Sequence, residues 1–272
     1  MIKALFLDLD GTLLNSEKKI PDSAVLAIQK CRAKGISVFP ATARSDRLER
    51  MLGWTKETYA LFSGGIYCNG GCNHIGDRVE YAYLPAEAVR TCVETVKDFP
   101  GVHLSLHMQG DLHAFNYTLP KEMYGPWGVT EKDILPLRED LYSGVVKILI
   151  FTHDLVNDAD PLPEELFQQL KASCGDTVKL YLSDRGKTVQ AVSREVGKYT
   201  AIEKLRIRFG LQKDEIAVFG DDVNDIEMLQ AYRNSVAMGN AVPEVKETAT
   251  YVTKANDEDG IAYALEKVLG LV

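Results

Sequence analysis

The segment Asp8-Leu9-Asp10-Gly11-Thr12 directly follows the apolar run Ile2-Lys3-Ala4-Leu5-Phe6-Leu7. A short apolar run that ends at acidic residues and a glycine is typical of a buried parallel strand. Two acids at the end of such a strand form either a helix-cap cluster or a functional site, and burying them without a partner is costly. Gly11 relieves steric restriction where the chain turns, which would let Asp10 point back toward Asp8.

The elements on either side of this segment predict a doubly wound sheet. Residues 21–34 have apolar positions at helical spacing and end before Gly35, and residues 36–41 form a second apolar strand. The same order returns near the C-terminus, with helices expected at 198–209 and 225–231 and strands at 215–219 and 235–238. Strand, helix, strand order indicates a right-handed crossover in a parallel sheet. The outer parts of the chain therefore predict an α/β, Rossmann-like fold.

The middle of the chain has a different pattern. Residues 102–108 alternate between apolar and polar side chains and lead through Gln109-Gly110-Asp111 into another strand, which predicts an antiparallel hairpin. Further strands are expected at 145–151 and 178–182, with helices at 85–98 and 163–173. We expect an α+β module at 84–192, inserted into an outer domain formed by 1–83 and 193–272.

Composition narrows the classes of function. The chain has 272 residues, 46% hydrophobic and 26% charged, which is near the average for globular proteins. A formal charge of -8 argues against nucleic-acid binding, which depends largely on Lys and Arg. The first apolar run is too short and too charged for a signal or membrane segment, so we expect a cytoplasmic protein without membrane contact. One sequence identifies no interface, so the oligomeric state is left open.

The cysteines predict free thiols. Their number is odd and they are scattered, unlike a disulfide framework: Cys31, Cys68, Cys72, Cys92 and Cys174. Cys68, Cys72 and His74 suggest a zinc site, but one loose cluster lacks a second pair of ligands. Structural or incidental cysteines are the favoured interpretation.

Polar residues follow three of the predicted parallel strands. In an open α/β sheet, ligands bind beyond the carboxyl ends of the strands, so these residues can converge on one site. Up to five carboxylates would gather there: Asp8, Asp10, Asp221, Asp222 and Asp225. Such a cluster needs a compensating cation, and an all-oxygen donor set suits Mg²⁺ better than zinc. Phosphate chemistry is the natural use of such a site.

Four segments together resemble the haloacid dehalogenase-type phosphatases. The motifs stand in the family's order: Asp8-Leu9-Asp10-Gly11-Thr12, Thr42, Lys198, and Gly220-Asp221-Asp222-Val223-Asn224-Asp225. The runs Met238-Gly239-Asn240-Ala241 and Asn256-Asp257-Glu258-Asp259-Gly260 resemble the Cof-type branch, and the similarity covers nearly all of both outer segments. One departure is Ala43, where that pattern usually has glycine, although a backbone N–H remains there.

The resemblance implies a role for each motif residue. Asp8 would attack phosphorus and become phosphorylated, and Asp10 would act as acid and then base. Mg²⁺ would be held by Asp8, the backbone carbonyl of Asp10 and Asp221, with Asp222 and Asp225 supporting. Groups that would bind the phosphate come from Thr42, backbone N–H groups such as that of Ala43, Lys198 and Asn224. Taken singly, Thr42 could be a turn residue and Lys198 a solvated surface charge, and Arg44 could contact substrate or cover a helix start.

The inserted module resembles the mobile α/β cap of Cof-type proteins, of the C2B kind, which implies that it selects the substrate. Small phosphorylated metabolites, sugar phosphates foremost, are the expected class. His103, His107 and His113 could face the substrate, but a solvated sheet face is the favoured interpretation for them. Two alternatives remain: a phosphosugar mutase, which would return the phosphoryl group to the sugar, and a phosphoacceptor or metabolite-binding protein with little turnover.

Overall fold

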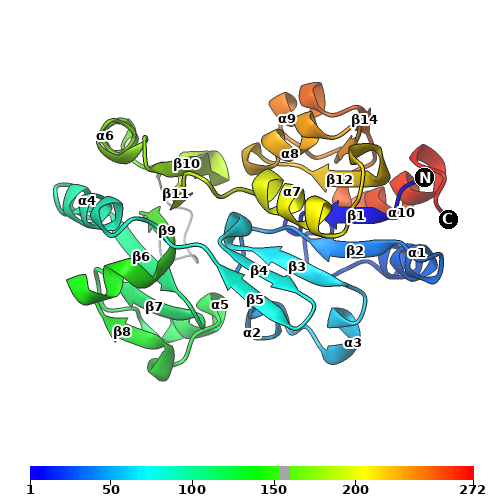
Figure 1. Ribbon diagram of the computed structural model, residues 1–272. Coiled ribbons are helices and arrows are strands. Elements are labelled where there is room, and N and C mark those ends of the chain that lie inside the picture. The colour runs from blue at the N-terminus through cyan, green and yellow to red at the C-terminus, as the bar shows by residue number, and fades with distance from the viewer. Residues whose placement is uncertain (153–159) are drawn as a thin grey trace. The chain divides into compact units, whose positions relative to one another are not determined.

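The computed structural model describes residues 1–152 and 160–272. These residues divide into two units (Figure 1). The first unit comprises Met1–Arg44, Trp54–Glu80 and Gly197–Val272, and the second comprises Ser45–Gly53 and Tyr81–Val196. Residues 45–53, which the sequence predicts to lie in the outer domain, belong to the second unit.

The first unit is built on a parallel sheet of five strands. In spatial order they are β14 (Tyr251–Val252), β13 (Asn234–Ala237), β12 (Ile216–Gly220), β1 (Ala4–Leu7) and β2 (Ser37–Pro40). All four neighbouring pairs run parallel. The central strands are fully buried, which is why their sequences are apolar throughout instead of alternating. The predicted α/β class with a doubly wound parallel sheet is confirmed.

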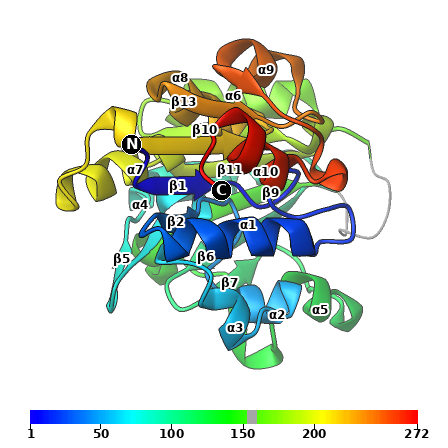
Figure 2. The same cartoon turned by 90° about the vertical axis from the view of Figure 1, so that its right-hand side faces the viewer.

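Helices cover both faces of this sheet. On one face α7 (Lys198–Arg208), α8 (Ile226–Ala231) and α9 (Pro243–Thr248) pack against the buried side chains of Ala4 and Phe6. On the other face α1 (Asp22–Ala33) lies beside α10 (Gly260–Tyr263), as Figure 2 shows. Helix α1 ends where the sequence predicted, because the next turn uses Gly35 at a φ of 81°. The alternation of strand side chains thus supplies two apolar layers from one sheet.

A small antiparallel sheet in the first unit was absent from the sequence prediction. Its strands are β3 (Gly64–Tyr67), β4 (Cys72–Ile75) and β5 (Arg78–Tyr81), preceded by α3 (Lys56–Tyr59). The amide of Thr42 donates to the carbonyl of Ile66 at 2.8 Å, which ties β3 to the end of β2. The turn between β3 and β4 contains Asn69 at a φ of 54°, a left-handed conformation that asparagine tolerates.

The second unit contains a six-stranded sheet. Its order is β10 (Val178–Ser183), β11 (Thr188–Ser193), β9 (Val145–Phe151), β6 (His103–Met108), β7 (Leu112–Phe115) and β8 (Ile134–Pro136). Strands β6 and β7 form the predicted antiparallel hairpin. The β11 strand was not predicted.

The two faces of this sheet have different cores. Helices α4 (Ala86–Lys97) and α6 (Glu164–Cys174) pack on one face over a large aliphatic cluster that includes Leu104 and Leu106. An aromatic cluster containing Phe115, Trp127 and Phe151 covers the opposite face, next to α5 (Tyr124–Trp127). The remaining helix, α2 (Leu48–Leu52), contacts α5. Among residues 1–152 and 160–272, no helix combines the length and apolar character needed to cross a bilayer.

Candidate active site

Three neighbouring strands of the first unit deliver polar residues to the same sheet edge. Asp8 follows β1, Asp221 follows β12, and Thr42 lies two residues beyond β2. Because β12, β1 and β2 are adjacent and parallel, their carboxyl ends coincide. The amide of Asp8 donates to the carbonyl of Phe219 at 3.1 Å, which continues the ladder and fixes Asp8 beside the start of the Asp221 loop.

Lys198 lies between two carboxylates at this edge. Its Nζ atom donates to Asp8 Oδ1 at 2.5 Å and to Asp225 Oδ1 at 2.7 Å. The lysine is only 1% exposed, so the interpretation of Lys198 as a solvated surface charge is wrong. As the first residue of α7, Lys198 reaches inward to groups from two distant segments, the end of β1 and the loop after β12. A buried ammonium is stable here because it has two charged hydrogen-bond partners.

Asp225 supports the loop after β12. Its Oδ2 atom accepts hydrogen bonds from the backbone amides of Asp221 and Asp222 at 3.0 and 3.2 Å. The close approach explains Gly220, because a Cβ there would stand 2.4 Å from Asp225 Cγ. Both Asp225 oxygens are thus used within the protein, one by Lys198 and the other by the backbone. Asp222 accepts from the amide of Val223 at 2.8 Å, which stabilises the same turn.

Asp221 faces the loop that follows β1. Thr12 Oγ1 donates to Asp221 Oδ1 at 2.7 Å, and Gly11 has a φ of 76°. A Cβ on Gly11 would stand 2.1 Å from Asp221 Oδ2, so glycine is required both for the backbone conformation and for the space. Burial raises the pKa of Asp221 to about 7, with repulsion from Asp225 acting in the same direction.

The donor set at this edge fits a hard divalent cation. Single carboxylate oxygens of Asp8, Asp221 and Asp225 lie within 4.8 Å of one another. Burial raises the pKa of Asp8, and repulsion from Asp225 and Asp221 adds to this effect against the attraction of Lys198. Three crowded acids and one ammonium leave negative charge uncompensated, and oxygen donors suit Mg²⁺. Since Asp225 is already engaged, Asp8 and Asp221 are the carboxylates available to a cation.

The Asp10 carboxylate is paired with two cations, Arg44 and Lys18. Arg44 Nε and Nη2 donate to its two oxygens at 2.6 and 2.8 Å, and Lys18 Nζ donates to Oδ1 at 2.8 Å. Burial by itself would raise the pKa of Asp10, but the hydrogen bonds and charges of Arg44 and Lys18 lower it to about 2. Lys18 was not predicted, because an exposed lysine in a turn carries no local signal. Arg44 thus forms a bidentate ion pair with Asp10.

The other predicted phosphate-binding groups form a chain of hydrogen bonds. Thr42 is buried, and its hydroxyl accepts from the amide of Arg44 at 3.1 Å. The carbonyl of Thr42 accepts from the amide of Asn69, and Asn69 Oδ1 accepts from Asn224 Nδ2 at 2.9 Å. Ala43 stands in the loop between Thr42 and Arg44. Asn69 was missed, because β3 and β4, which position it, were not predicted.

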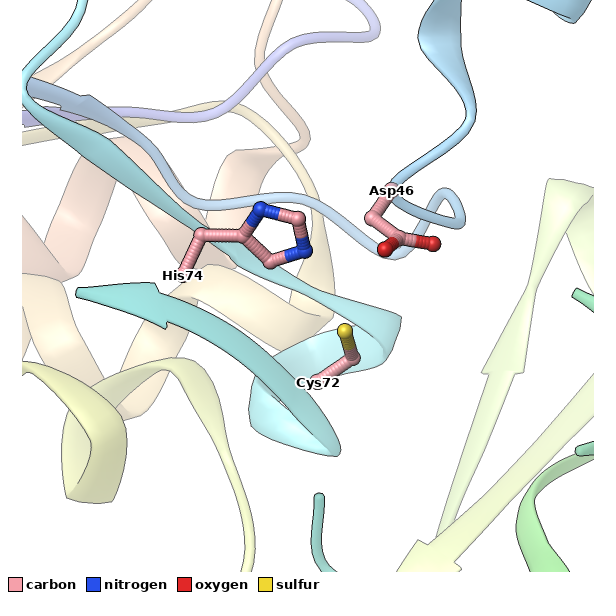
Figure 3. Close-up of side chains that lie close together, drawn as sticks. All are labelled: Asp46, Cys72 and His74. Carbon is pink, nitrogen blue, oxygen red and sulfur yellow. The ribbon is translucent and has the colours of Figure 1, made fainter. Parts of the chain in front are cut away.

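The suggested zinc ligands come from the small antiparallel sheet. Cys72 and His74 project from the same face of β4, as Figure 3 shows, while Cys68 lies in the turn before it. Asp46, also labelled there, belongs to the second unit. All five cysteines are buried free thiols, as predicted.

Two of the three histidines predicted to lie on a solvated sheet face are buried in the structure. His107 and His113 are 5% and 4% exposed, so the interpretation of their sheet face as solvated is wrong for both. The reason is the aromatic cluster around α5, which covers that face and packs Trp127 against His113 at a ring distance of 5.8 Å. His103 is partly buried and its ring lies 4.0 Å from that of Tyr117.

Comparison with known proteins identifies the family to which the chain belongs. The sequence matches the family of haloacid dehalogenase-like hydrolases over residues 5–265. A putative phosphatase of Bacillus subtilis, YkrA, is 31% identical over 274 residues, covering 99% of this chain and 98% of that protein. A second protein of that organism, the 5-amino-6-(5-phospho-D-ribitylamino)uracil phosphatase YwtE, is 27% identical over 302 residues, with 98% of each chain covered.

A solved structure agrees with these relatives. A sugar phosphatase of subclass IIB superimposes with a TM-score of 0.80 at 28% identity, covering 99% of this chain and 100% of that one. Both units therefore have counterparts in a single known architecture.

Proposed function

Since the chain belongs to the haloacid dehalogenase-like hydrolases and is a phosphatase, we propose that it hydrolyses small phosphate monoesters through a phosphorylated Asp8. The observation that carries this proposal is the setting of Asp8. It directly follows β1, contacts the buried ammonium of Lys198, and lies two residues before a second carboxylate with different partners.

In the first step an Asp8 oxygen attacks phosphorus in line, the bond from phosphorus to the ester oxygen breaks, and Asp10 gives its proton to the leaving alkoxide. In the second step Asp10 takes a proton from water, whose oxygen attacks the same phosphorus. Inorganic phosphate leaves and the Asp8 carboxylate is restored. Lys198 holds Asp8 oriented, and its charge reduces the cost of bringing a carboxylate to an anionic phosphate.

Asp10 cannot donate a proton while Arg44 and Lys18 hold it ionised. An entering phosphate offers these cations a second anion. We infer that contact between substrate and Arg44 loosens the bidentate pair, which would let the Asp10 carboxyl carry the proton. Thr42, the Ala43 amide and Asn224 would then hydrogen-bond the remaining phosphoryl oxygens.

Mg²⁺, held by Asp8, Asp221 and the backbone carbonyl of Asp10, would supply positive charge at the transferred phosphoryl group. The raised pKa of Asp221 and the hard oxygen donors support this assignment. Thr12 and Gly11 position the Asp221 carboxylate, Thr12 by a hydrogen bond and Gly11 by leaving space.

The second unit is proposed to be the cap that selects the substrate, with sugar phosphates as the leading class. The support is the likeness to a sugar phosphatase and to a phosphatase of a phosphoribityl compound. A separate α+β module lets specificity vary without changing the residues that transfer phosphate.

Phosphate release from a panel of sugar phosphates and other small esters, with and without Mg²⁺, tests the proposal. We expect Mg²⁺-dependent release by the wild type and by Asp22→Asn, a control for an exposed acid on α1, and none by Asp8→Asn. Phosphorus NMR of the same reactions separates the alternatives. An isomerised ester without free phosphate would indicate a mutase, and unchanged esters throughout would indicate a binding protein.

A further inference from the structure

Three potential metal ligands converge in the second unit, in the hairpin of β6 and β7. His107 and His113 are directly paired across the two strands, so their side chains point to the same face. Asp111 stands in the connecting turn at a φ of 62°. The left-handed conformation turns its carboxylate back toward the two rings. Sequence neighbours within seven residues thus deliver two imidazoles and one carboxylate to one point.

The spacing of the donor atoms suits tetrahedral coordination. Asp111 Oδ1 lies 3.0 Å from His107 Nε2 and 3.4 Å from His113 Nε2. All three donors lie within 4.8 Å of one another. Ligand bonds of about 2.0–2.1 Å at tetrahedral angles separate two ligand atoms by about 3.3–3.4 Å. A cation can therefore be accommodated among these atoms with small side-chain rotations.

The burial and the chemical type of the three side chains also suit a metal ion. His107, Asp111 and His113 are each 5% exposed or less. Their burial removes the ligand atoms from competing water, and an imidazole ligates through a ring nitrogen that carries no proton. Two imidazoles and one carboxylate are a common donor set for zinc and its neighbours in the first transition row.

Groups around the cluster orient the ligands. Ser105 Oγ lies 3.4 Å from His113 Nδ1, the ring nitrogen that would remain outside the coordination sphere. Arg50 Nη1 lies 3.9 Å from Asp111 Oδ2, while its nearer partner is Asp133 at 2.9 Å. Arg50 therefore faces the Asp111 oxygen opposite to the one shared with the histidines, and Oδ1 is left for the cation.

The ammonium of Lys147 opposes the binding of a metal cation at this cluster. Lys147 is paired with His107 across β6 and β9, it is buried, and its charge acts on the His107 ring. An ammonium near a dication weakens binding by repulsion. This repulsion gives the site a diagnostic signature, because removing the lysine charge should strengthen metal binding.

We propose that His107, Asp111 and His113 form a binding site for a first-row transition-metal dication, with Zn²⁺ as the reference ion. Water would complete the tetrahedron. The cation would join both strands of the hairpin to its own turn, beneath the aromatic cluster of Phe115 and Trp127. This inference is independent of the phosphatase chemistry, because it uses nitrogen donors in the other unit.

Titration of the full-length protein with Co²⁺, a coloured substitute for Zn²⁺, tests the site. A large excess of Mg²⁺ occupies the oxygen-donor site of the first unit and leaves histidine ligands unaffected. We expect one equivalent of Co²⁺ to bind and to give the visible absorption spectrum of tetrahedral Co²⁺. Excess Zn²⁺ should displace the Co²⁺ and abolish this absorption. His107→Gln and His113→Gln should each weaken binding at least tenfold, and Lys147→Met should tighten it several-fold.

His74→Ala and His103→Ala serve as controls and should bind Co²⁺ like the wild type. Histidine NMR of the unmodified protein gives a measurement that does not depend on whether the variants fold, since Zn²⁺ should shift the signals of two rings. Absence of any spectrum and of any ring shift would mean that the imidazoles only hydrogen-bond Asp111. Equal Co²⁺ affinity of wild type, His107→Gln and His113→Gln would likewise overturn the proposal.

Discussion

Gly11→Ala should strongly reduce the activity of the enzyme while leaving most of its stability. An added Cβ would stand 2.1 Å from Asp221 Oδ2, whereas real Cβ contacts are essentially never below 3.0 Å, so the carboxylate must move by about 0.9 Å. A displacement of about 1 Å at a catalytic group can cost about 100-fold in rate. We therefore expect kcat to fall about 100-fold, together with a higher Mg²⁺ requirement. The left-handed φ adds a stability cost of about 1 kcal/mol.

Gly35→Ala is the matched control. Gly35 has a φ of 81°, close to that of Gly11, but an added Cβ there would meet nothing within 4 Å. Both variants should lose similar stability in urea denaturation, and only Gly11→Ala should lose activity in a steady-state assay across Mg²⁺ concentrations. Near wild-type kcat for Gly11→Ala, or an equal loss in Gly35→Ala, would refute the argument that the Asp221 position is what glycine protects.

Three further outcomes are expected. Lys198→Met should lower the free energy of unfolding of the first unit by about 3–5 kcal/mol, measured with urea, because it leaves the buried Asp8 carboxylate without its cation. Arg44→Gln should raise the pKa of the Asp10 carboxyl above about 2, as followed by carbon NMR of labelled aspartate, since the ion pair that lowers this pKa is lost. The second unit, with metal removed by a chelator, should lose up to about 3 kcal/mol of stability as pH falls from 6.5 to 4, because unfolded His107 gains a proton near its ordinary pKa while the folded residue does so only near 4. In His107→Gln that pH dependence should be reduced.

Strands and helices with strong periodicity were predictable, and weakly patterned ones were not. The run before Asp8 is apolar throughout because β1 is covered on both faces, and this property is written in consecutive residues. The stretch Gly64–Tyr67 begins with two glycines and has no clear alternation. Its pairing with β4 comes from turn geometry at Asn69 and from contact with the end of β2. The burial of His107 could not be predicted either, because a polar residue on an alternating strand gives the same sequence pattern whether water or α5 covers that face.

For the active site, the sequence by itself determined which residue types stand after which strands, since motif order and strand ends are local properties of the chain. The tertiary structure alone decided how those residues pair. Lys198 bridges Asp8 and Asp225, and Arg44 binds Asp10, across separations of tens to hundreds of residues. Such pairings depend on directions of side chains in space and on the water excluded around them. Both arise only when the strands are adjacent and the helices have packed over them.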